Sequence, residues 1–180
     1  MELSATGKVI LGMLASRPRS GYEIKQLVDN SARFFWAASY GQIYPELKKL
    51  EKARLVTGAD SSQGARQRTT FKLTADGRRV AREWIGQPPE VLETRDEGLL
   101  KLFFAGALPP QEAVKTLRAM RNRSQETIGR LRELEPKVMA AGGYPLMVLR
   151  GGIELNEWYS DWCERMQGQL LAEAEEKEAS

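Results

Sequence analysis

The sequence predicts a mostly α-helical chain that contains one small β-hairpin, and three observations lead to this prediction. Apolar residues recur at three- and four-residue spacing over most of the 180 residues. Two short stretches of the first half, residues 55–57 and 68–74, read as strands instead, and a polar, glycine-containing loop joins them. Gln87-Pro88-Pro89-Glu90 then interrupts the chain. We therefore expect two domains, residues 1–87 and 88–180.

The first two helices are expected over residues 3–16 and 20–29. Ser4 is suited to cap the N-terminus of the first, and a turn-rich segment that contains Pro18 and Gly21 separates the two. Ser20 can cap the second helix, and Glu23, three residues further on, completes the pattern of a capping box.

The third helix is expected to open at Ser39, with Gln42 as its capping-box partner. Its inward face is formed by Ile43, Leu47 and Leu50, which have helical spacing. Proline is tolerated only in the first turn of a helix, so Pro45 favours a start slightly after Ser39, or a kink.

A hairpin and a fourth helix complete the first half. Phe71 and Leu73 share one face of the second expected strand, and Thr74 is placed to cap a helix that carries Val80, Trp84 and Ile85. Three helices followed by a two-stranded ribbon are typical of a winged helix-turn-helix, in which the second helix of the pair enters the DNA major groove. Here that helix is the one that follows Ser39.

The second half is predicted to be a helical dimerisation domain. A short apolar helix over residues 97–107 precedes two long helices, which Gly142-Gly143 separates. Both long helices have a coiled-coil-like seam that neither helix can bury alone, so we expect a homodimer. The predicted dimer contacts are Leu117, Met120, Leu131, Leu134, Leu155, Tyr159, Trp162 and Met166.

Charge is distributed unevenly between the two halves. Residues 1–84 contain 15 Lys and Arg against 8 Asp and Glu, a net charge of +7, whereas residues 85–180 contain 12 against 16, a net charge of −4. The two values sum to the chain's +3. A basic half next to an acidic one favours a polyanion as the partner of the first half, although chance scatter of surface charge gives the same sums.

Missing residue types exclude several functions. The chain has no histidine and a single cysteine, Cys163, so histidine-dependent triads, an intrachain disulfide and a thiolate cluster for a metal are excluded. We expect no enzyme activity, no metal and no cofactor. No apolar run is long enough to span a membrane, and Val9–Ala15 lacks the basic lead of a signal peptide, so a cytoplasmic protein without a membrane partner is expected.

The side chains left outside on the third helix are polar, aromatic or basic. A glutamine amide can pair with an adenine edge, lysine reaches phosphates or guanine, and tyrosine hydroxyls bond phosphate oxygens. An ordinary solvated helix face is the alternative. The predicted contacts of this segment with double-stranded DNA are Tyr40, Gln42, Tyr44, Lys48 and Lys49.

Three further candidates lie outside that helix. Arg66 and Arg68 belong to the expected wing, where arginine can follow the phosphates or enter a minor groove; an ordinary polar hairpin tip is the alternative. Tyr22, two residues after Ser20, can direct a hydroxyl toward the backbone of DNA at a helix start, or pack into the core.

Aromatic and methionine side chains gather on the last helix. Trp158, Trp162 and Met166 are candidates for a pocket that binds a small hydrophobic or aromatic effector. A dimer core of the same residues is the alternative, and the one that we favour.

The chain resembles the PadR family of bacterial transcriptional regulators over nearly its full length. The resemblance rests on Val9–Leu14, Ser20–Ile24, Phe71–Gly77 and above all Gly41–Glu51, which reads Gly-Gln-Ile-Tyr-Pro-Glu-Leu-Lys-Lys-Leu-Glu. The family also carries a proline at the place of Pro45. The wing departs from the family pattern, because Thr69-Thr70 stands where an aromatic residue is common.

The resemblance implies more than the residues alone. It implies a dimer that binds an inverted-repeat operator, mostly as a repressor, and in some members releases DNA on binding a small molecule. It implies that Ser39, Gln42, Tyr44 and Lys48 contact DNA from the recognition helix and that Tyr22 contacts phosphate. The second half resembles the longer subfamily, which has several C-terminal helices. A DNA-binding protein without an effector, and a winged helix used for protein contacts, stay open as alternatives.

Overall fold

A computed structural model describes residues 3–29, 40–61, 68–89 and 95–178 of the chain. The chain forms two compact units, Met1–Val91 and Leu92–Ser180, and each is described by itself. The sequence placed the boundary after residue 87. Along the described ranges, no helix combines the length and the apolar character that crossing a membrane requires.

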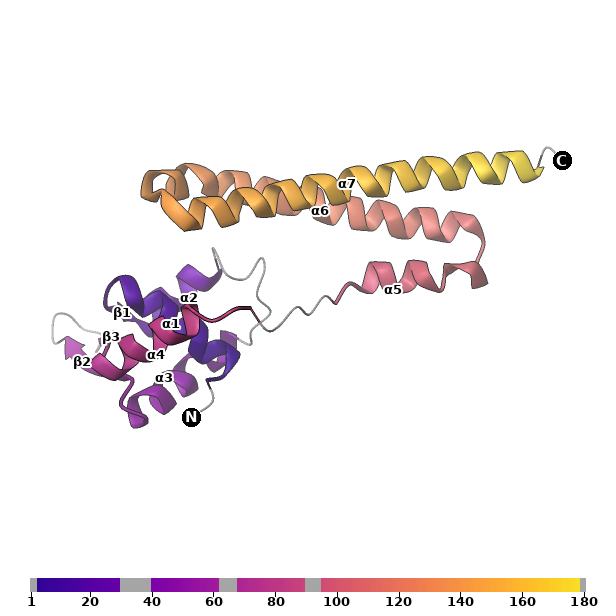
Figure 1. The fold of residues 1–180 in the computed structure, drawn as a ribbon. Coiled ribbons are helices and arrows are strands. Elements are labelled where there is room, and N and C mark those ends of the chain that lie inside the picture. Colours follow the sequence, from indigo (N-terminus) through magenta and orange to yellow (C-terminus); the bar gives the residue numbers. More distant parts are fainter. Residues whose placement is uncertain (1–2, 30–39, 62–67, 90–94, 179–180) are drawn as a thin grey trace. The chain divides into compact units, whose positions relative to one another are not determined.

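The first unit has the predicted order of elements, with one strand in addition (Figure 1). The elements are α1 (Ala5–Ser16), β1 (Arg19–Ser20), α2 (Gly21–Asp29), the 3-10 turn η2 (Tyr40–Gln42), α3 (Ile43–Lys52), β2 (Val56–Ser61), β3 (Arg68–Leu73) and α4 (Ala75–Ile85). Helices and a small sheet therefore form a winged helix-turn-helix, as the sequence predicts.

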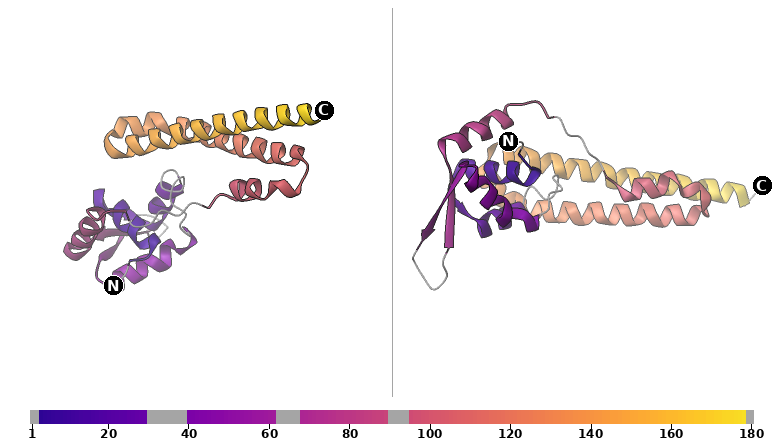
Figure 2. Two further views of the ribbon diagram at one scale, coloured as in Figure 1. Left: turned by 45° about the vertical axis from the view of Figure 1, so that its right-hand side comes forward. Right: turned by 90° about the horizontal axis from the view of Figure 1, so that it is seen from below.

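The sheet has three antiparallel strands in the order β1-β3-β2. Strand β1 was not predicted, because two residues are too few to show an alternating pattern. It pairs Arg19 with Phe71 and Ser20 with Thr70, and so ties the turn between α1 and α2 to the hairpin. Figure 2 shows the β2–β3 hairpin projecting beyond the helices of this unit.

The predicted inward face of α3 is confirmed, because Ile43, Leu47 and Leu50 are at most 1% exposed. The remaining buried apolar residues of this core are Ile10, Leu11, Leu14, Ile24, Val28, Leu55, Val56, Leu73 and Ala81.

Helix α4 packs within the first unit through small residues. Ile85 is exposed and Trp84 is only half-buried, while Gly77 and Ala81 are the buried residues of the helix. A Cβ atom at Gly77 would lie 1.9 Å from the carbonyl oxygen of Leu55, so α4 approaches the chain before β2 through small residues. Val80, Trp84 and Ile85 lie on this helix as predicted, but Trp84 and Ile85 are not part of its buried face.

The predicted N-terminal caps are confirmed for three of the four α-helices of the first unit. Ser4 Oγ accepts a hydrogen bond from Gly7 N at 2.9 Å, and Thr74 Oγ1 accepts one from Gly77 N at 3.0 Å. Ser20 and Glu23 form the capping box: Ser20 N donates to Glu23 Oε2 at 2.8 Å and Glu23 N donates to Ser20 Oγ at 3.3 Å.

Helix α3 is the exception. It begins at Ile43, after the 3-10 turn, so Pro45 lies in its first turn. Gln42 occupies the N-cap position itself, and its side chain makes no capping hydrogen bond. Ser39 lies outside the described residues, so its predicted capping box with Gln42 stays a prediction.

The second unit consists of α5 (Glu97–Phe103), the 3-10 turn η3 (Ala105–Ala107), α6 (Pro110–Ala141) and α7 (Gly143–Glu178). The two long helices run side by side in opposite directions (Figures 1 and 2). Gly142 and Gly143 join them with φ angles of 65° and 67°, a left-handed conformation that favours glycine. Helix α5 packs against α6.

The long helices bury part of their apolar faces against each other within one chain. Leu117, Met120 and Leu131 of α6 are buried in this way, so these three predicted dimer contacts are core residues of a single subunit. On α7 the buried stripe is shifted by about one position from the predicted seam. It consists of Leu149, Ile153, Ser160 and Cys163.

Candidate nucleic-acid interface

The outer side of α3 is the candidate DNA-binding surface. Gln42, Tyr44, Lys48 and Lys49 are all exposed, on the sides of the helix that the apolar core leaves uncovered. Lys48 and Lys52 lie opposite the buried residues, because they are five residues from Ile43 and from Leu47, about 140° around the helix. The structure thus brings these four predicted residues together on one accessible helix, at the end of which Lys52 adds a further positive charge.

Tyr44 fixes the approach of α2 to α3. A Cβ atom added at Gly21 would lie 2.6 Å from Cε1 of Tyr44, so the ring packs directly on the backbone where α2 begins. Tyr44 nevertheless stays 54% exposed. Its ring therefore spaces the two helices of the helix-turn-helix while the side chain remains accessible to a ligand.

Tyr22 lies in the first turn of α2 and is exposed, which decides against core packing for this residue. Its hydroxyl oxygen accepts a hydrogen bond from Gln26 Nε2 at 2.9 Å, one turn further along the helix. This hydrogen bond holds the hydroxyl at the surface, where it can still donate its proton to an incoming oxygen.

Lys49 has an ionic partner within its own helix. Its Nζ lies 3.2 Å from Glu46 Oε2, and the Glu46 side chain is 9% exposed while that of Lys49 is 69% exposed. Glu46 Oε1 also accepts a hydrogen bond from Ser4 Oγ at 2.6 Å. Sequence reasoning missed Glu46, although its position directly before the inward Leu47 and three residues after the inward Ile43 places it at the edge of the buried face.

The wing is a regular antiparallel hairpin from the pair Val56–Leu73 to the pair Ser61–Arg68. Thr69 Oγ1 donates to Asp60 Oδ1 at 2.7 Å across the strands. Arg66 lies outside the described residues. Arg68 is described only through its backbone, which forms the last pair of the ladder with Ser61. Of the predicted recognition-helix contacts, Tyr40 lies in η2 and is described only through its backbone. Ser39 lies outside the described residues.

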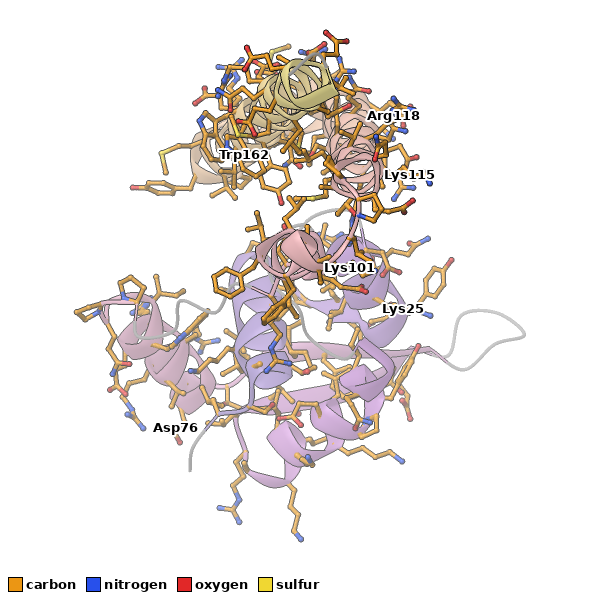
Figure 3. The ribbon with its side chains drawn as sticks, turned by 90° about the vertical axis from the view of Figure 1, so that its right-hand side faces the viewer. Lys25, Asp76, Lys101, Lys115, Arg118 and Trp162 are labelled. Carbon is orange, nitrogen blue, oxygen red and sulfur yellow. The ribbon has the colours of Figure 1, made fainter. Side chains whose placement is uncertain are left out.

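The predicted dimer residues of α7 have mixed environments. Leu155 is 63% exposed, whereas Tyr159, Trp162 and Met166 are half-buried against a core of Leu117, Met120 and Cys163. Leu134 of α6 is also half-buried. Figure 3 shows Lys115 and Arg118 extending outward from α6, away from Trp162.

A large apolar surface of the second unit remains uncovered within one chain. On α5 and the segment after it the exposed apolar residues are Leu99, Leu100, Phe103, Phe104 and Leu108. On α7 they include Tyr144, Met147, Val148, Leu155, Trp158 and Leu171. A surface of this kind commonly marks a protein interface.

The candidate effector residues do not line either of two hollows in the second unit. One hollow, of about 390 Å³, is mainly apolar and is lined by Leu102, Ala105, Gly106, Leu108, Pro110, Ala113, Leu170, Glu173 and Ala174. The other, of about 530 Å³, is polar and lies between α6 and α7 around Arg132 and Glu157. Trp162 and Met166 pack on the core instead, and Trp158 is exposed.

Known proteins share this architecture. Residues 10–83 match the Transcriptional regulator PadR-like family, and residues 94–170 match the Virulence activator alpha C-term family. The negative transcriptional regulator PadR of Bacillus subtilis is 30% identical over 168 residues, which cover 86% of this chain and 91% of that protein.

Solved structures agree with the sequence comparison. Bacillus subtilis PadR in complex with operator DNA has a TM-score of 0.83 at 27% identity, over 94% of this chain and 99% of that chain. The same regulator in complex with p-coumaric acid has a TM-score of 0.76 at 26% identity, over 93% and 99%. The Vibrio cholerae virulence activator AphA has a TM-score of 0.72 at 25% identity, over 94% and 99%.

These relatives are transcriptional regulators and not enzymes, in agreement with the prediction from the sequence. The identity and coverage of the Bacillus regulator, together with the exposed basic face of a helix-turn-helix, establish the kind of protein. The chain belongs to the PadR-like family of DNA-binding transcriptional regulators.

Proposed function

We propose that the chain is a repressor that binds an inverted-repeat operator as a homodimer and is released from it by a small molecule. The observation that carries the proposal is the outer side of α3, where Gln42, Tyr44 and Lys48 are exposed on a helix whose other side is held by the core. A recognition helix needs this combination of rigid support and accessible polar side chains. The similar Bacillus regulator is described as a negative regulator and binds operator DNA.

A homodimer is supported by the uncovered apolar surface of the second unit. Phe103 is 81% exposed and Leu155 is 63% exposed, values that are costly for side chains of this size in a monomer. A two-fold symmetric dimer buries one such surface against its copy and presents two recognition helices to two half-sites. The inverted repeat of the proposed operator follows from this symmetry.

Release by a small molecule is supported by the structure of the similar Bacillus regulator with p-coumaric acid. In this chain, the apolar hollow between the end of α5, the start of α6 and the end of α7 is the better candidate for a hydrophobic or aromatic effector. Its volume of about 390 Å³ is within the usual range of small-molecule pockets. Glu173 is the one ionisable residue among those that line it, so a neutral or cationic ligand fits this hollow better than an anion, unlike the carboxylic acid in the structure of the Bacillus regulator.

Activation is the second candidate function. The second unit matches the Virulence activator alpha C-term family over residues 94–170, and AphA is described as a virulence activator. Whether a bound dimer blocks or recruits RNA polymerase depends on the position of the operator, which the chain's own residues do not determine.

One experiment tests the proposal in two steps. The full-length protein selects duplexes from a random-sequence library. Matches to the selected sequence are then located at the promoters of the genome that encodes the protein, and transcription from these promoters is measured in vitro. An enriched inverted repeat and reduced transcription in vitro support the repressor. Enrichment of a single half-site would contradict the homodimer on DNA, and increased transcription would favour the activator.

A further inference from the structure

The recognition helix α3 carries two carboxylates that bond neighbouring elements. Glu46 lies in its first turn and contacts the N-terminus of α1, and Glu51 lies in its last turn and contacts strand β2 of the wing. We propose that Glu46 and Glu51 are positioning residues that fix α3 between α1 and the wing and so set the sequence specificity of DNA binding. The inference rests on the proposed function of α3 as the helix that reads the operator.

The contact at Glu46 is built from three residues that depend on one another. Ser4 Oγ donates to Glu46 Oε1 at 2.6 Å and at the same time accepts from Gly7 N at 2.9 Å, as the cap of α1. A Cβ atom added at Gly7 would lie 3.0 Å from Glu46 Oε1, tighter than ordinary contacts. Glu46 is only 7% exposed. The carboxylate thus fits a space left by a glycine and bonds the hydroxyl that starts α1.

The contact at Glu51 likewise places a carboxylate beside a glycine of a neighbouring element. Gly58 N donates to Glu51 Oε1 at 2.8 Å, which joins the end of α3 to strand β2. A Cβ atom added at Gly58 would lie 3.0 Å from Glu51 Oε1 and 2.9 Å from Thr69 Cγ2. A glycine again leaves the space for the carboxylate, this time next to the central strand of the sheet.

These hydrogen bonds restrain movements of α3 that the apolar core leaves less restricted. Ile43, Leu47 and Leu50 hold α3 on the core, but hydrophobic contacts are non-directional and leave rotation and sliding of the helix less restricted. Hydrogen bonds are directional, and one at each end of the helix restrains both movements. A binding site requires side chains held to within about 0.5 Å.

Charge supports the same conclusion. DNA affinity comes largely from cations that displace counterions, so a carboxylate on the recognition helix lowers the affinity for every duplex. Glu46 also pairs with Lys49, at 3.2 Å, and partly neutralises a charge that would otherwise attract phosphate. The charges of the two carboxylates therefore do not favour DNA binding, and their hydrogen bonds to Ser4 and Gly58 indicate a role in placement.

The test compares alanine and glutamine variants of the full-length protein. Glutamine keeps an oxygen that can accept from Ser4 Oγ or Gly58 N but has no charge. Glu83 of α4 is the matched control, because it is exposed and its Oε1 bonds Arg79 within the same helix at 2.9 Å. The probes are the duplex that the wild-type protein selects from a random library and a scrambled duplex of the same composition, and the readout is the ratio of the two affinities.

We expect Glu46→Ala and Glu51→Ala to lower this specificity ratio about threefold to tenfold, the range that one lost hydrogen bond implies. Glu46→Gln and Glu51→Gln restore most of the ratio, whereas Glu83→Ala and Glu83→Gln leave it unchanged. All six variants gain affinity for the scrambled duplex, because each removes a negative charge. Ser4→Ala lowers the ratio as well, and adding it to Glu46→Ala causes no further loss, because both break the same contact.

Two outcomes overturn the inference. The first is an unchanged ratio in Glu46→Ala and Glu51→Ala while Gln42→Ala lowers it, which leaves the proposed function intact. The second is a loss in the glutamine variants as large as in the alanine variants, since placement by a hydrogen bond should survive in an amide. If Glu46→Ala is unfolded at the assay temperature, Ser4→Ala and Glu46→Gln decide. Ser4→Ala must lower the ratio, Glu46→Gln must keep most of it, and their double variant must match Ser4→Ala, because both residues form the same contact. Loss of specificity in the carboxylate variants with none in Gln42→Ala supports the inference and rejects Gln42 as the base-reading residue.

Discussion

The hydroxyl of Tyr159 on α7 donates a hydrogen bond of 2.5 Å to Oδ2 of Asp96, and Oδ1 of the same carboxylate caps α5 by accepting from Leu99 N at 3.0 Å. One carboxylate therefore both starts α5 and holds it to α7. Burial and the hydrogen bond to Asp96 raise the pKa of Tyr159. Burial alone would raise the pKa of Asp96, but the hydrogen bonds from Tyr159, Leu99 and Gly98 and the charge of Arg123 together outweigh it, and the pKa is lowered.

Tyr159→Phe should destabilise the protein by about 1 kcal/mol, the usual net value of one hydrogen bond. The loss should depend on pH. Because the pKa of Asp96 is lower in the folded protein than its ordinary value of 3.8, its contribution is present above that value and disappears as pH falls through the folded pKa. Urea unfolding of both proteins between pH 7 and the acid transition checks this. A stability difference that grows toward acid pH would contradict the assignment.

Two glycines in helices of the first unit should respond oppositely to alanine. Gly77→Ala should destabilise by about 3 kcal/mol or more, because the new Cβ would lie 1.9 Å from a backbone oxygen of Leu55 that cannot move aside. Gly12→Ala is the control, since no atom lies within 4 Å of the new Cβ and alanine favours the helix by about 0.5–1 kcal/mol. Thermal melts of both variants test the pair. Equal melting temperatures would show that α4 does not approach Leu55 this closely.

The dimer prediction can be tested at one exposed side chain. Phe103→Glu places a charge in the apolar surface of α5 and should shift the protein from dimer to monomer at micromolar concentration. Gln111→Glu makes the same change of charge at an exposed position of α6 and should leave the dimer intact. Sedimentation velocity distinguishes the two states. An unaffected dimer in Phe103→Glu would place the interface elsewhere, and a monomeric wild type would remove the basis for an inverted-repeat operator.

Signals that lie close together in the sequence predicted most of the fold. The capping box of Ser20 and Glu23 and the inward face of Ile43, Leu47 and Leu50 depend only on spacing within one helix, and both are confirmed. The two-residue strand β1 is too short to leave such a signal.

Contacts between distant residues explain the errors. Glu46 bonds Ser4 across 42 positions, so the spacing within α3 places this glutamate at the edge of the buried face but does not reveal its partner. On α7, two neighbouring stripes are apolar, and the sequence does not show which of them the chain's own α6 covers. The stripe with Ile153 and Cys163 is covered, whereas Leu155 of the other stripe stays exposed. For the same reason Leu117 was assigned to the dimer although it is buried within one chain.

Gln42 and Lys48 should separate base reading from phosphate anchoring. Gln42 is exposed at the start of α3, the part of a recognition helix that meets base edges, and its amide can both donate and accept. Gln42→Ala should weaken binding to the selected duplex by about 1–3 kcal/mol and relax the preference at one base pair of each half-site. Lys48→Ala should weaken all duplexes about equally and lower the slope of log affinity against log salt by about one per subunit. Titrations of both variants with selected and scrambled duplexes at several salt concentrations measure the two effects independently.

Arg66, outside the described residues, should behave as Lys48 does if the wing follows the phosphates. An unchanged preference in Gln42→Ala would mean that another side chain of α3 faces the bases, and an unchanged salt slope in Lys48→Ala would mean that this lysine does not neutralise a phosphate.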